Sequence, residues 1–169
     1  MLTLQEINII KYNINMLDIE DFKKKLDKKS RLMGIDPGRR RIGIAISDDE
    51  KKIATPFTTL IKKNYSNFLI EIQKIVRENE IQGIVVGNPI NLDGTPSRSS
   101  QSAKDLAIKL SKDITKNIMM WDERLSSQGA FKLSSNLDIN TTKRVEKLDE
   151  NAAQFILQGV LDYLSKNNT

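Results

Sequence analysis

The 169-residue chain contains no cysteine and no histidine. This absence excludes disulfide bonds, zinc sites built from cysteine or histidine, cysteine nucleophiles and Ser-His-Asp triads. Any catalysis must therefore use carboxylates, lysine, tyrosine, serine or threonine. A metal, if one is used, is expected to be a hard cation bound by oxygen, such as Mg²⁺ or Mn²⁺.

Long apolar runs are also missing, and none approaches the length of a membrane span. The N-terminus lacks the basic, apolar and small-residue segments of a secretion signal, so we expect a cytoplasmic protein with no membrane partner. The length predicts one main domain with a real core. A net charge of +5 favours an anionic partner, although it also fits an ordinary basic surface.

Residues 1–30 form an N-terminal extension ahead of a domain that spans 31–169. Apolar residues at roughly helical spacing predict an amphipathic helix near 18–29, which either packs on the domain or frays. Residues 1–15 have weak periodicity and fit a disordered tail, and Met16 is an alternative start site.

From residue 31 the pattern reads strand, strand, strand, helix, strand, helix, strand, helix, helix. It predicts an α/β fold with a mixed five-stranded sheet, three antiparallel strands then two parallel ones, flanked by helices. Pro56 suggests an edge or a bulge in the third strand. Ser66 is the expected N-cap of the first helix and Asn79 its expected end. The expected strands are 31–36, 41–47, 53–61, 81–87 and 118–122, and the expected helices are 66–79, 98–112, 126–133 and 149–164, with a polar segment over 134–147.

Asp36 is the most informative residue of the chain. It ends a short apolar run and opens a Pro-Gly turn that leads into three consecutive arginines, Arg39, Arg40 and Arg41. An ionised carboxylate among apolar neighbours is costly to desolvate unless a cation compensates it. Because the arginines suit an anionic substrate, the pattern indicates metal-assisted chemistry on phosphate groups. The alternative is an ordinary turn aspartate that accepts backbone hydrogen bonds.

Asp149 is a second candidate ligand. It lies three and four residues before Ala152 and Ala153, which belong to the apolar stripe of the last helix, so it shares the buried face. Metal ligation would explain an inward carboxylate at this position. An acidic residue in a first helical turn is also favoured by the helix dipole alone.

Asp122 and Glu123 come at the carboxyl end of a strand, where ligands collect in open α/β sheets. Strand alternation puts them on opposite faces, so only one is expected to reach the metal. We expect this strand to lie two positions from the Asp36 strand, roughly 10 Å away, and the longer Glu123 spans that gap better than Asp122. The alternative is an N-cap Asp122 followed by a solvated first turn with Glu123 and Arg124.

Further cations accompany these acids. Arg124 would contact phosphate, and Lys143, Arg144 and Lys147 would close on a nucleic-acid backbone, although a solvated charged loop is an equal alternative. The polar loop 88–97 precedes a helix N-terminus that suits a phosphate, or it is an inert connector.

Four motifs in order resemble the YqgF/RuvX family, Holliday-junction-resolvase-like proteins of the RNase H-like fold. They are Gly34–Asp48, Val86-Gly87-Asn88-Pro89 with Asp93-Gly94-Thr95, Asp122-Glu123-Arg124-Leu125-Ser126, and Asp149 with Ala152-Ala153. The likeness covers about residues 31–165. It departs from the family at Asn88, where the family usually has an apolar residue, and in the length of the N-terminal segment.

The resemblance implies a nuclease that processes the 5′ end of the 16S rRNA precursor in ribosome biogenesis, or one that resolves branched DNA. It implies an acidic site of Asp36, Glu123 (or Asp122) and Asp149 that binds Mg²⁺ or Mn²⁺. We hypothesise metal-assisted phosphodiester hydrolysis, with Arg39, Arg40, Arg41 and Arg124 positioning the strand through its phosphates. A non-catalytic RNA-binding or assembly factor and a nucleotide-hydrolysing relative are the alternatives, and both a monomer and a dimer fit the sequence.

Overall fold

The computed structural model describes residues 1–4, 16–91, 93–125 and 141–166, and the side chains of the last segment from residue 151 onward. Its strands are β1 (Met16–Leu17), β2 (Arg31–Pro37), β3 (Arg41–Ser47), β4 (Ala54–Ile61), β5 (Ile81–Asn88) and β6 (Asn117–Asp122). Its helices are α2 (Ile19–Lys24), α3 (Tyr65–Glu78), α4 (Arg98–Asp113) and α6 (Thr141–Lys166), with a 3₁₀ turn η1 (Glu123–Leu125).

The strands form one mixed sheet in the order β1-β6-β5-β2-β3-β4. Strands β2, β3 and β4 pair antiparallel, whereas β2, β5, β6 and β1 pair parallel. The five predicted strands and the α/β class are confirmed, including the position of β6 two strands from β2. The structure adds β1 from the N-terminal extension, a strand of two residues that is too short to show any alternation in the sequence.

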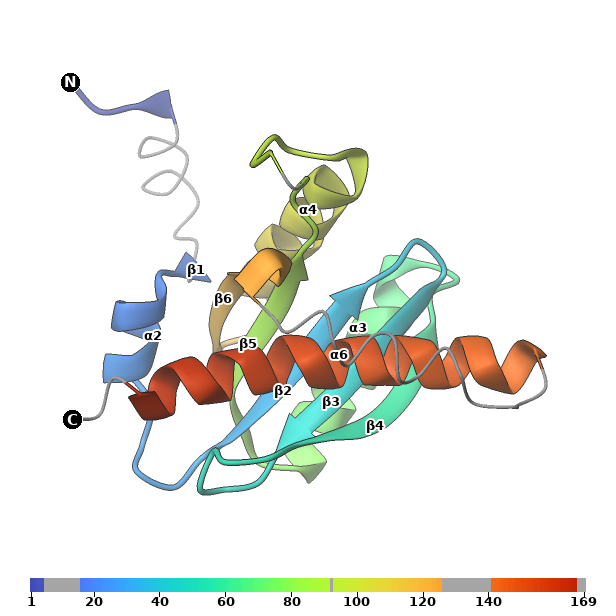
Figure 1. Cartoon of the computed structure of the whole chain (residues 1–169), viewed down its shortest axis with the longest axis horizontal. Coiled ribbons are helices and arrows are strands. Elements are labelled where there is room, and N and C mark those ends of the chain that lie inside the picture. Colours follow the sequence, from blue (N-terminus) through green and yellow to red (C-terminus); the bar gives the residue numbers. More distant parts are fainter. Residues whose placement is uncertain (5–15, 92, 126–140, 167–169) are drawn as a thin grey trace.

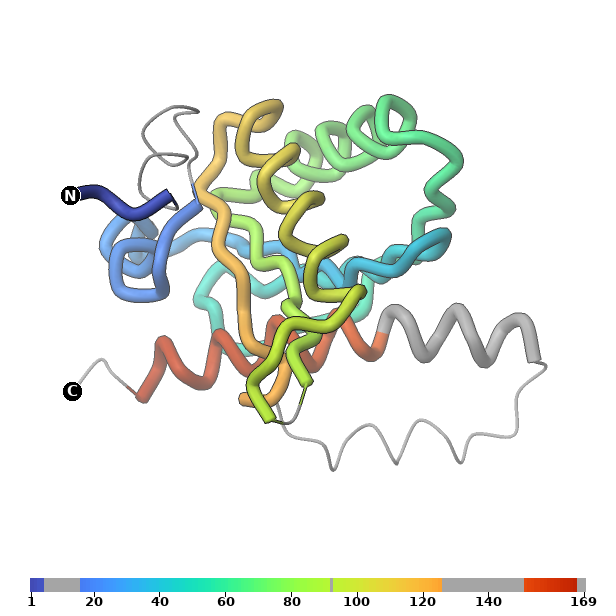
Figure 2. Tube along the Cα trace, turned by 90° about the horizontal axis from the view of Figure 1, so that it is seen from above, coloured from blue at the N-terminus to red at the C-terminus, as the bar shows by residue number. Residues whose placement is uncertain are grey.

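The sheet has a helix layer on each face, α6 on one and α3 with α4 on the other (Figure 1, Figure 2). Met33 and Ile35 of β2 belong to the core under α3 and α4, and Leu32 belongs to the core under α6. Gly34 follows the same alternation, and a Cβ atom there would lie 2.7 Å from Cβ of Leu157 on α6. Glycine therefore lets α6 approach β2 closely.

The N-terminal extension packs on the α6 side of the sheet. Asp18 caps α2 by accepting a hydrogen bond from the backbone N–H of Asp21 at 2.8 Å, and Phe22 is fully buried. The predicted helix near 18–29 therefore forms, but it ends at Lys24. The tail predicted over 1–15 falls largely on residues outside those described.

Beyond the end of this helix, hydrogen bonds hold the chain to the turn between β3 and β4. The Lys51 ammonium donates to the backbone carbonyls of Asp27 and Lys28, both at 2.8 Å, and to Oγ of Ser30 at 3.1 Å. These hydrogen bonds fix the chain over 27–30 where it leads into β2.

Two other expectations about local structure hold. Strand β4 is at an edge of the sheet, and its pairing with β3 slips beside Pro56, between the pairs Ile44–Thr58 and Ala45–Pro56. Asn79 caps the C-terminus of α3 as predicted.

Two predicted helix starts are wrong. Helix α3 is capped by Asn64 instead of Ser66, because the Asn64 side chain accepts a hydrogen bond from the N–H of Asn67 at 2.8 Å. Helix α6 begins at Thr141 instead of about residue 149, so it takes in half of the predicted polar segment 134–147. The helix predicted over 126–133 lies outside the described residues. None of the described helices is long and apolar enough to cross a bilayer.

Candidate functional site

Asp36 lies at the carboxyl end of β2, on the face covered by α6. It follows Gly34 by two residues, and Gly34 packs directly against α6, so alternation places both on that face. The parallel pairing of β2 with β5 reaches Ile35 and Val86. Asp36 therefore lies one row further along, beside Gly87 of β5.

Gly87 provides the space that brings a second acid to this row. A Cβ atom on Gly87 would lie 2.6 Å from Oε1 of Glu123 and 2.6 Å from Cδ1 of Ile156 on α6. The Glu123 carboxylate thus extends from the end of β6 over the neighbouring strand β5, on the α6 face. Adjacent strands are about 5 Å apart, so this placement brings Glu123 toward the strand that carries Asp36.

The surroundings of Glu123 penalise its negative charge. Its Oε1 atom is buried and has no hydrogen-bond partner among the described residues. Burial raises the pKa of Glu123 above its ordinary value, and the nearby charge of Asp122 raises it further. A buried carboxylate oxygen without a donor is the kind of ligand that a cation would satisfy.

Asp122 has a different environment from its neighbour. Its carboxylate accepts from Nη2 of Arg124 at 2.6 Å, from Nε at 3.0 Å and from the Arg124 backbone N–H at 3.0 Å. The Arg124 hydrogen bonds lower the pKa of Asp122. Asp122 thus caps η1, which was the structural alternative for this residue, and it occupies the guanidinium that we expected to contact phosphate.

Asp149 is placed here by the backbone of α6 alone, since its side chain lies outside the described residues. Asp149 lies four residues before Ala153. The carbonyl oxygen of Ala153 would lie 3.0 Å from a Cβ atom on Gly34. Asp149 precedes Ile156, which contacts the Gly87 position, by seven. Spacings of four and seven share one helix face, so Asp149 has a register position on the stripe that faces the sheet.

The described side chains contain no group of three acids that could hold a metal ion. The structure brings Asp36 and Glu123 to one face of the sheet, and the third predicted ligand, Asp149, is outside the side chains described. This pair and the unpartnered oxygen of Glu123 fit a site for a hard cation such as Mg²⁺ or Mn²⁺.

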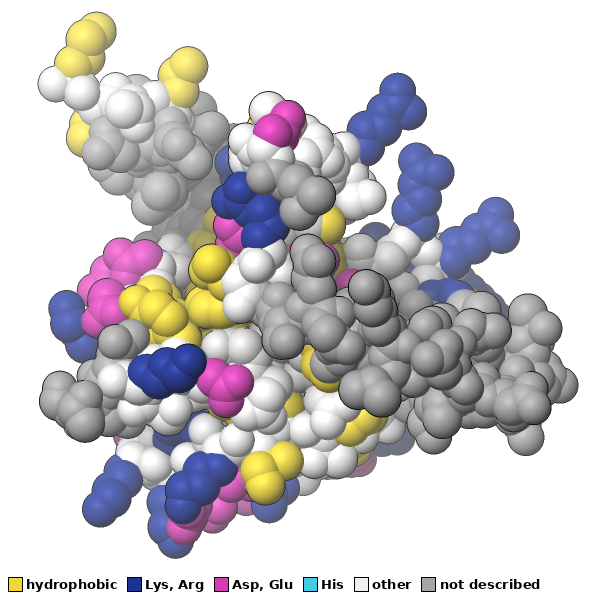
Figure 3. All heavy atoms as spheres, in the orientation of Figure 1, with side chains coloured by type: hydrophobic (Ala, Val, Ile, Leu, Met, Phe, Trp, Pro, Cys, Tyr) yellow, Lys and Arg dark blue, Asp and Glu magenta, His cyan; other side chains and the backbone are white. Residues whose placement is uncertain are grey.

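The basic turn between β2 and β3 lies next to Asp36. Gly38 is required there, because a Cβ atom would lie 2.0 Å from the carbonyl oxygen of Arg41. Arg39 and Arg40 are exposed, and Arg41 is partly buried at the start of β3. Lys and Arg side chains project from this part of the molecule at the upper right of Figure 3. Lys143, Arg144 and Lys147 belong to the first turns of α6, and their side chains are not among those described.

The loop after β5 is ordered by hydrogen bonds of its own side chains. Oδ1 of Asn88 accepts from Oγ of the buried Ser100 at 2.7 Å, which explains how a polar residue is accommodated at this position. Ser97 caps α4 by accepting from the N–H of Ser100 at 2.9 Å. Thr95 donates from its backbone N–H to Asp93 at 2.9 Å, and Gly94 has a positive φ of 85°.

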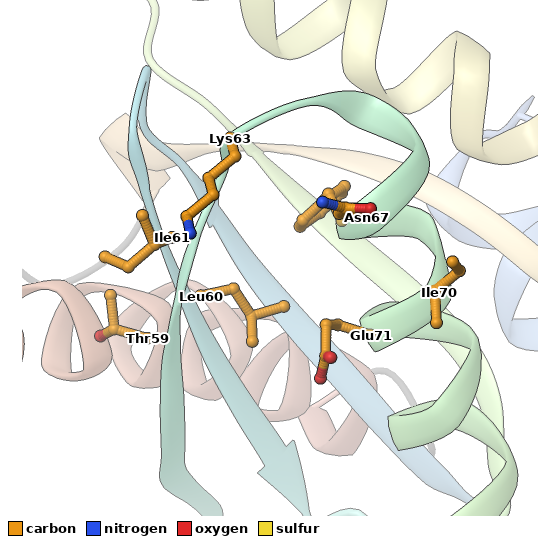
Figure 4. Close-up of a pocket in the computed structure, with 8 residues that line it drawn as sticks. Thr59, Leu60, Ile61, Lys63, Asn67, Ile70 and Glu71 are labelled. Atoms are coloured by element: carbon orange, nitrogen blue, oxygen red, sulfur yellow. The ribbon is translucent and has the colours of Figure 1, made fainter.

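One hollow can be set aside as the reactive site. It has a volume of about 360 Å³ and lies between β4 and α3 (Figure 4). It contains a lysine and one acid, Lys63 and Glu71, and none of the predicted site residues.

A second hollow, of about 320 Å³, lies beside the basic turn. It is lined by Pro37, Gly38, Arg39, Arg98, Ser99 and Ser102. Arg98, Ser99 and Ser102 did not appear among the candidates from the sequence. The only signal for them was the hydroxyl-rich loop that leads into α4.

Comparison with known proteins identifies the family. A family model described as "RuvX: Holliday junction resolvase" matches residues 30–163. The chain belongs to the RuvX family. Every acid of the predicted site falls within the RuvX match, whereas β1 and α2 precede it.

Curated relatives cover nearly the same length. A protein of Pelagibacter ubique (strain HTCC1062) named "Putative pre-16S rRNA nuclease" is 51% identical over 150 residues, 89% of this chain and 99% of that protein. A Rhodobacter capsulatus protein of the same name is 39% identical over 147 residues, 87% of this chain and 92% of its own length.

Solved structures agree with the RuvX assignment at the level of the fold. RuvC of T. thermophilus in complex with a Holliday junction substrate superposes with a TM-score of 0.52 at 10% identity, covering 82% of this chain and 96% of that chain. The yeast mitochondrial Holliday junction resolvase Ydc2 superposes with a TM-score of 0.53 at 10% identity, covering 88% and 85%. The predicted RNase H-like fold is thereby confirmed.

Proposed function

We propose that this protein is a metal-dependent nuclease that hydrolyses phosphodiester bonds, with the 5′ region of the 16S rRNA precursor as its substrate. The observation that carries the proposal is the Glu123 carboxylate, which lies over Gly87 on the sheet face that also carries Asp36. Membership of the RuvX family and the names of the curated relatives support the choice of reaction and substrate.

Asp36, Glu123 and Asp149 would hold Mg²⁺ or Mn²⁺. The structure supports this ligand set through the unpartnered Glu123 oxygen and its raised pKa, since a nearby cation would favour the ionised carboxylate. When bound, such an ion polarises the phosphoryl group and makes water a stronger nucleophile at neutral pH.

The chain's own residues position the acids and the substrate. Pairing of Asp36 with Gly43 of β3 fixes the backbone at the end of β2, and η1 directs Glu123 over β5. The Asp122–Arg124 pair closes η1 and holds its first residue in place. Arg39 and Arg40 would contact backbone phosphates, which positions a strand without reading its sequence.

Branched DNA is the second candidate substrate, and the description of the RuvX family model favours it specifically. The same acidic site would serve either substrate, because hydrolysis of a phosphodiester bond requires the same groups in RNA and in DNA. The Arg39–Arg41 turn contacts phosphates in either case, so substrate choice would depend on the shape of the nucleic acid.

The test uses purified protein with a precursor 16S rRNA fragment and a four-way DNA junction, with and without Mg²⁺ or Mn²⁺. We expect metal-dependent cleavage of the RNA. Asp36→Asn should reduce the cleavage rate roughly 100- to 1,000-fold, the loss typical of removing one group that stabilises the transition state. Its thermal midpoint should stay close to that of the wild type.

Asp105→Asn is the matched control, because Asp105 is an exposed acid on α4, on the sheet face opposite to α6 (Figure 1), and it should leave the rate unchanged. Undiminished cleavage by Asp36→Asn would refute the assignment of the site. Tight RNA binding without cleavage at any metal concentration would support the alternative of a non-catalytic assembly factor.

A further inference from the structure

The hollow between the basic turn and α4 lies at the same edge of the sheet as the acidic residues, on the side opposite to α6. Its lining comes from the turn after β2, with Pro37, Gly38 and Arg39, and from the first turns of α4, with Arg98, Ser99 and Ser102. Pro37 directly follows Asp36. The hollow and the acidic residues are therefore separated only by the end of β2.

The lining is suited to an anion. It holds two guanidinium groups from separate elements and two hydroxyl groups, and it contains no carboxylate. Among the described residues, neither Arg39 nor Arg98 forms an ion pair with an acid. Guanidinium groups match phosphate oxygens with two parallel hydrogen bonds, and serine hydroxyls add donors of a different geometry.

Both walls of the hollow have backbones that are already fixed. On one side the N–H of Gly38 donates to the carbonyl of Asp36 at 3.1 Å, and the N–H of Lys62 donates to the carbonyl of Arg40 at 2.7 Å. On the other side Oγ of Ser97, the cap of α4, donates to the carbonyl of Pro89 at 2.7 Å. A ligand would therefore have to order only the side chains of the lining.

The volume of about 320 Å³ also agrees with a phosphodiester group. A water molecule takes up about 30 Å³, so the hollow corresponds to roughly ten waters. It thus accommodates one phosphodiester group with part of its hydration shell, and it is polar on both walls.

We propose that Arg39, Arg98, Ser99 and Ser102 form a subsite for a backbone phosphate of the substrate strand, at a fixed offset from the bond that is cut. The strand then crosses the end of β2, with the scissile phosphate on the α6 side and the held phosphate on the α4 side. This subsite rests on the proposed nuclease function and names residues beyond the acidic site.

The first experiment measures binding separately from cleavage. The Asp36→Asn protein is titrated with fluorescent single-stranded RNA in Ca²⁺, and the dissociation constant is followed against salt concentration. Adding Arg39→Gln and Arg98→Gln should raise the dissociation constant about 10-fold or more and lower the salt slope by about 1, because one phosphate contact is lost. The matched control adds Lys74→Gln and Arg77→Gln, two exposed cations on α3, and should change binding less than about 2-fold.

The second experiment locates the held phosphate. Single phosphates of the RNA are replaced in turn by neutral methylphosphonates. Replacement at one position, at a constant offset from the cleavage site, should weaken RNA binding as much as the double substitution does. The same replacement should have no further effect on RNA binding by the double variant. An equal effect at every position, or a double variant that binds like the control, would overturn the subsite.

Inorganic phosphate distinguishes a strand subsite from a site for free anions. It should compete weakly with RNA in the parent protein and not at all in the double variant. If inorganic phosphate bound at Arg39 and Arg98 but left the dissociation constant for RNA unchanged, the proposal would be contradicted. Binding is measured in the Asp36→Asn protein, whereas cleavage is measured in the wild type. Failure of the nuclease proposal would therefore appear only as missing cleavage, and failure of the subsite only as unchanged binding.

Discussion

Strand β5 presents two glycines, Gly83 and Gly87, to the same face of the sheet, and their environments differ completely. A Cβ atom on Gly83 would lie 2.6 Å from Cζ of Phe22, and one on Gly87 would lie 2.6 Å from Oε1 of Glu123. Each glycine makes room for a side chain from another element. At one end of the strand the occupant is an aromatic ring, and at the other it is a carboxylate.

The difference separates an end of β5 that stabilises the fold from an end that costs stability. Burying the Phe22 ring removes apolar surface from water and contributes roughly 2–3 kcal/mol to stability. The buried Oε1 atom of Glu123 has no described partner and costs stability instead. A structure that keeps a costly group in a prepared space has a reason other than packing for keeping it.

The substitution Gly87→Ala gives the strongest test of the difference between the two glycines. The added methyl group displaces the Glu123 carboxylate and the end of Ile156, both of which are flexible side-chain ends. We expect an approximately 1,000-fold loss in the cleavage rate, similar to the loss of one stabilising group, with a small change in thermal midpoint. Steady-state cleavage assays and thermal unfolding measure the two effects.

Gly83→Ala is the control on the same strand and face. Its methyl group meets the Phe22 ring, so overpacking should lower the free energy of unfolding by about 1–3 kcal/mol while cleavage below the transition stays near wild type. If the two alanine variants lost the same activity, the division between the two ends of β5 would be wrong.

Phe22→Ala has the next largest effect and concerns stability alone. Truncation of this fully buried ring leaves a cavity between α2 and β5, and we expect the free energy of unfolding to fall by about 3 kcal/mol. Urea denaturation measures the change. Loss of cleavage in protein that is still folded would show that the N-terminal extension contributes to the site and not only to the core.

Glu123→Gln has the smallest expected effect on stability and depends on pH. The native pKa of Glu123 is raised, so the native state binds a proton more tightly than the unfolded state does. The protonated group carries no penalty below pH 4.5, the ordinary pKa of a glutamate, and the penalty grows as the pH rises from there to the native pKa. The glutamine variant should therefore be the more stable protein at neutral pH.

Because Glu123 is only partly buried, we expect a gain of about 1 kcal/mol, or roughly 2–4 °C in thermal midpoint, at pH 7 without divalent ions. The gain should disappear near pH 4. Saturating Mg²⁺ should stabilise the wild type and reverse the order. A gain that is independent of pH would mean that the charge of Glu123 is not the cause.

Much of the fold follows from local patterns in the sequence. Pro56 indicated an edge strand with an irregularity, because proline lacks the N–H that a central strand needs, and β4 has both features. The alternation in β6 and the length of Glu123 together indicated that Glu123, and not Asp122, extends over β5 toward the strand that carries Asp36. The proline and alternation arguments depend on neighbouring residues, where covalent geometry dominates.

Several features that the sequence did not predict depend on contacts between distant residues. The ammonium of Lys51 holds the chain that follows the N-terminal helix by binding the carbonyls of Asp27 and Lys28, and nothing in the pattern near 18–29 signals it. Strand β1 exists only because β6 offers an open edge. The Arg98 hollow likewise requires two elements to meet, so no window of the sequence contains it.

The acidic residues come from β2, η1 and α6, and the parallel pairing of β2, β5 and β6 joins strands far apart in the chain. Such topologies form slowly, because distant segments must meet before any contact is gained. Asp36 and Glu123 approach each other only after β5 is inserted between their strands. A partly folded chain would therefore be harmless to the nucleic acids around it, and hydrolysis would begin only when the sheet is complete.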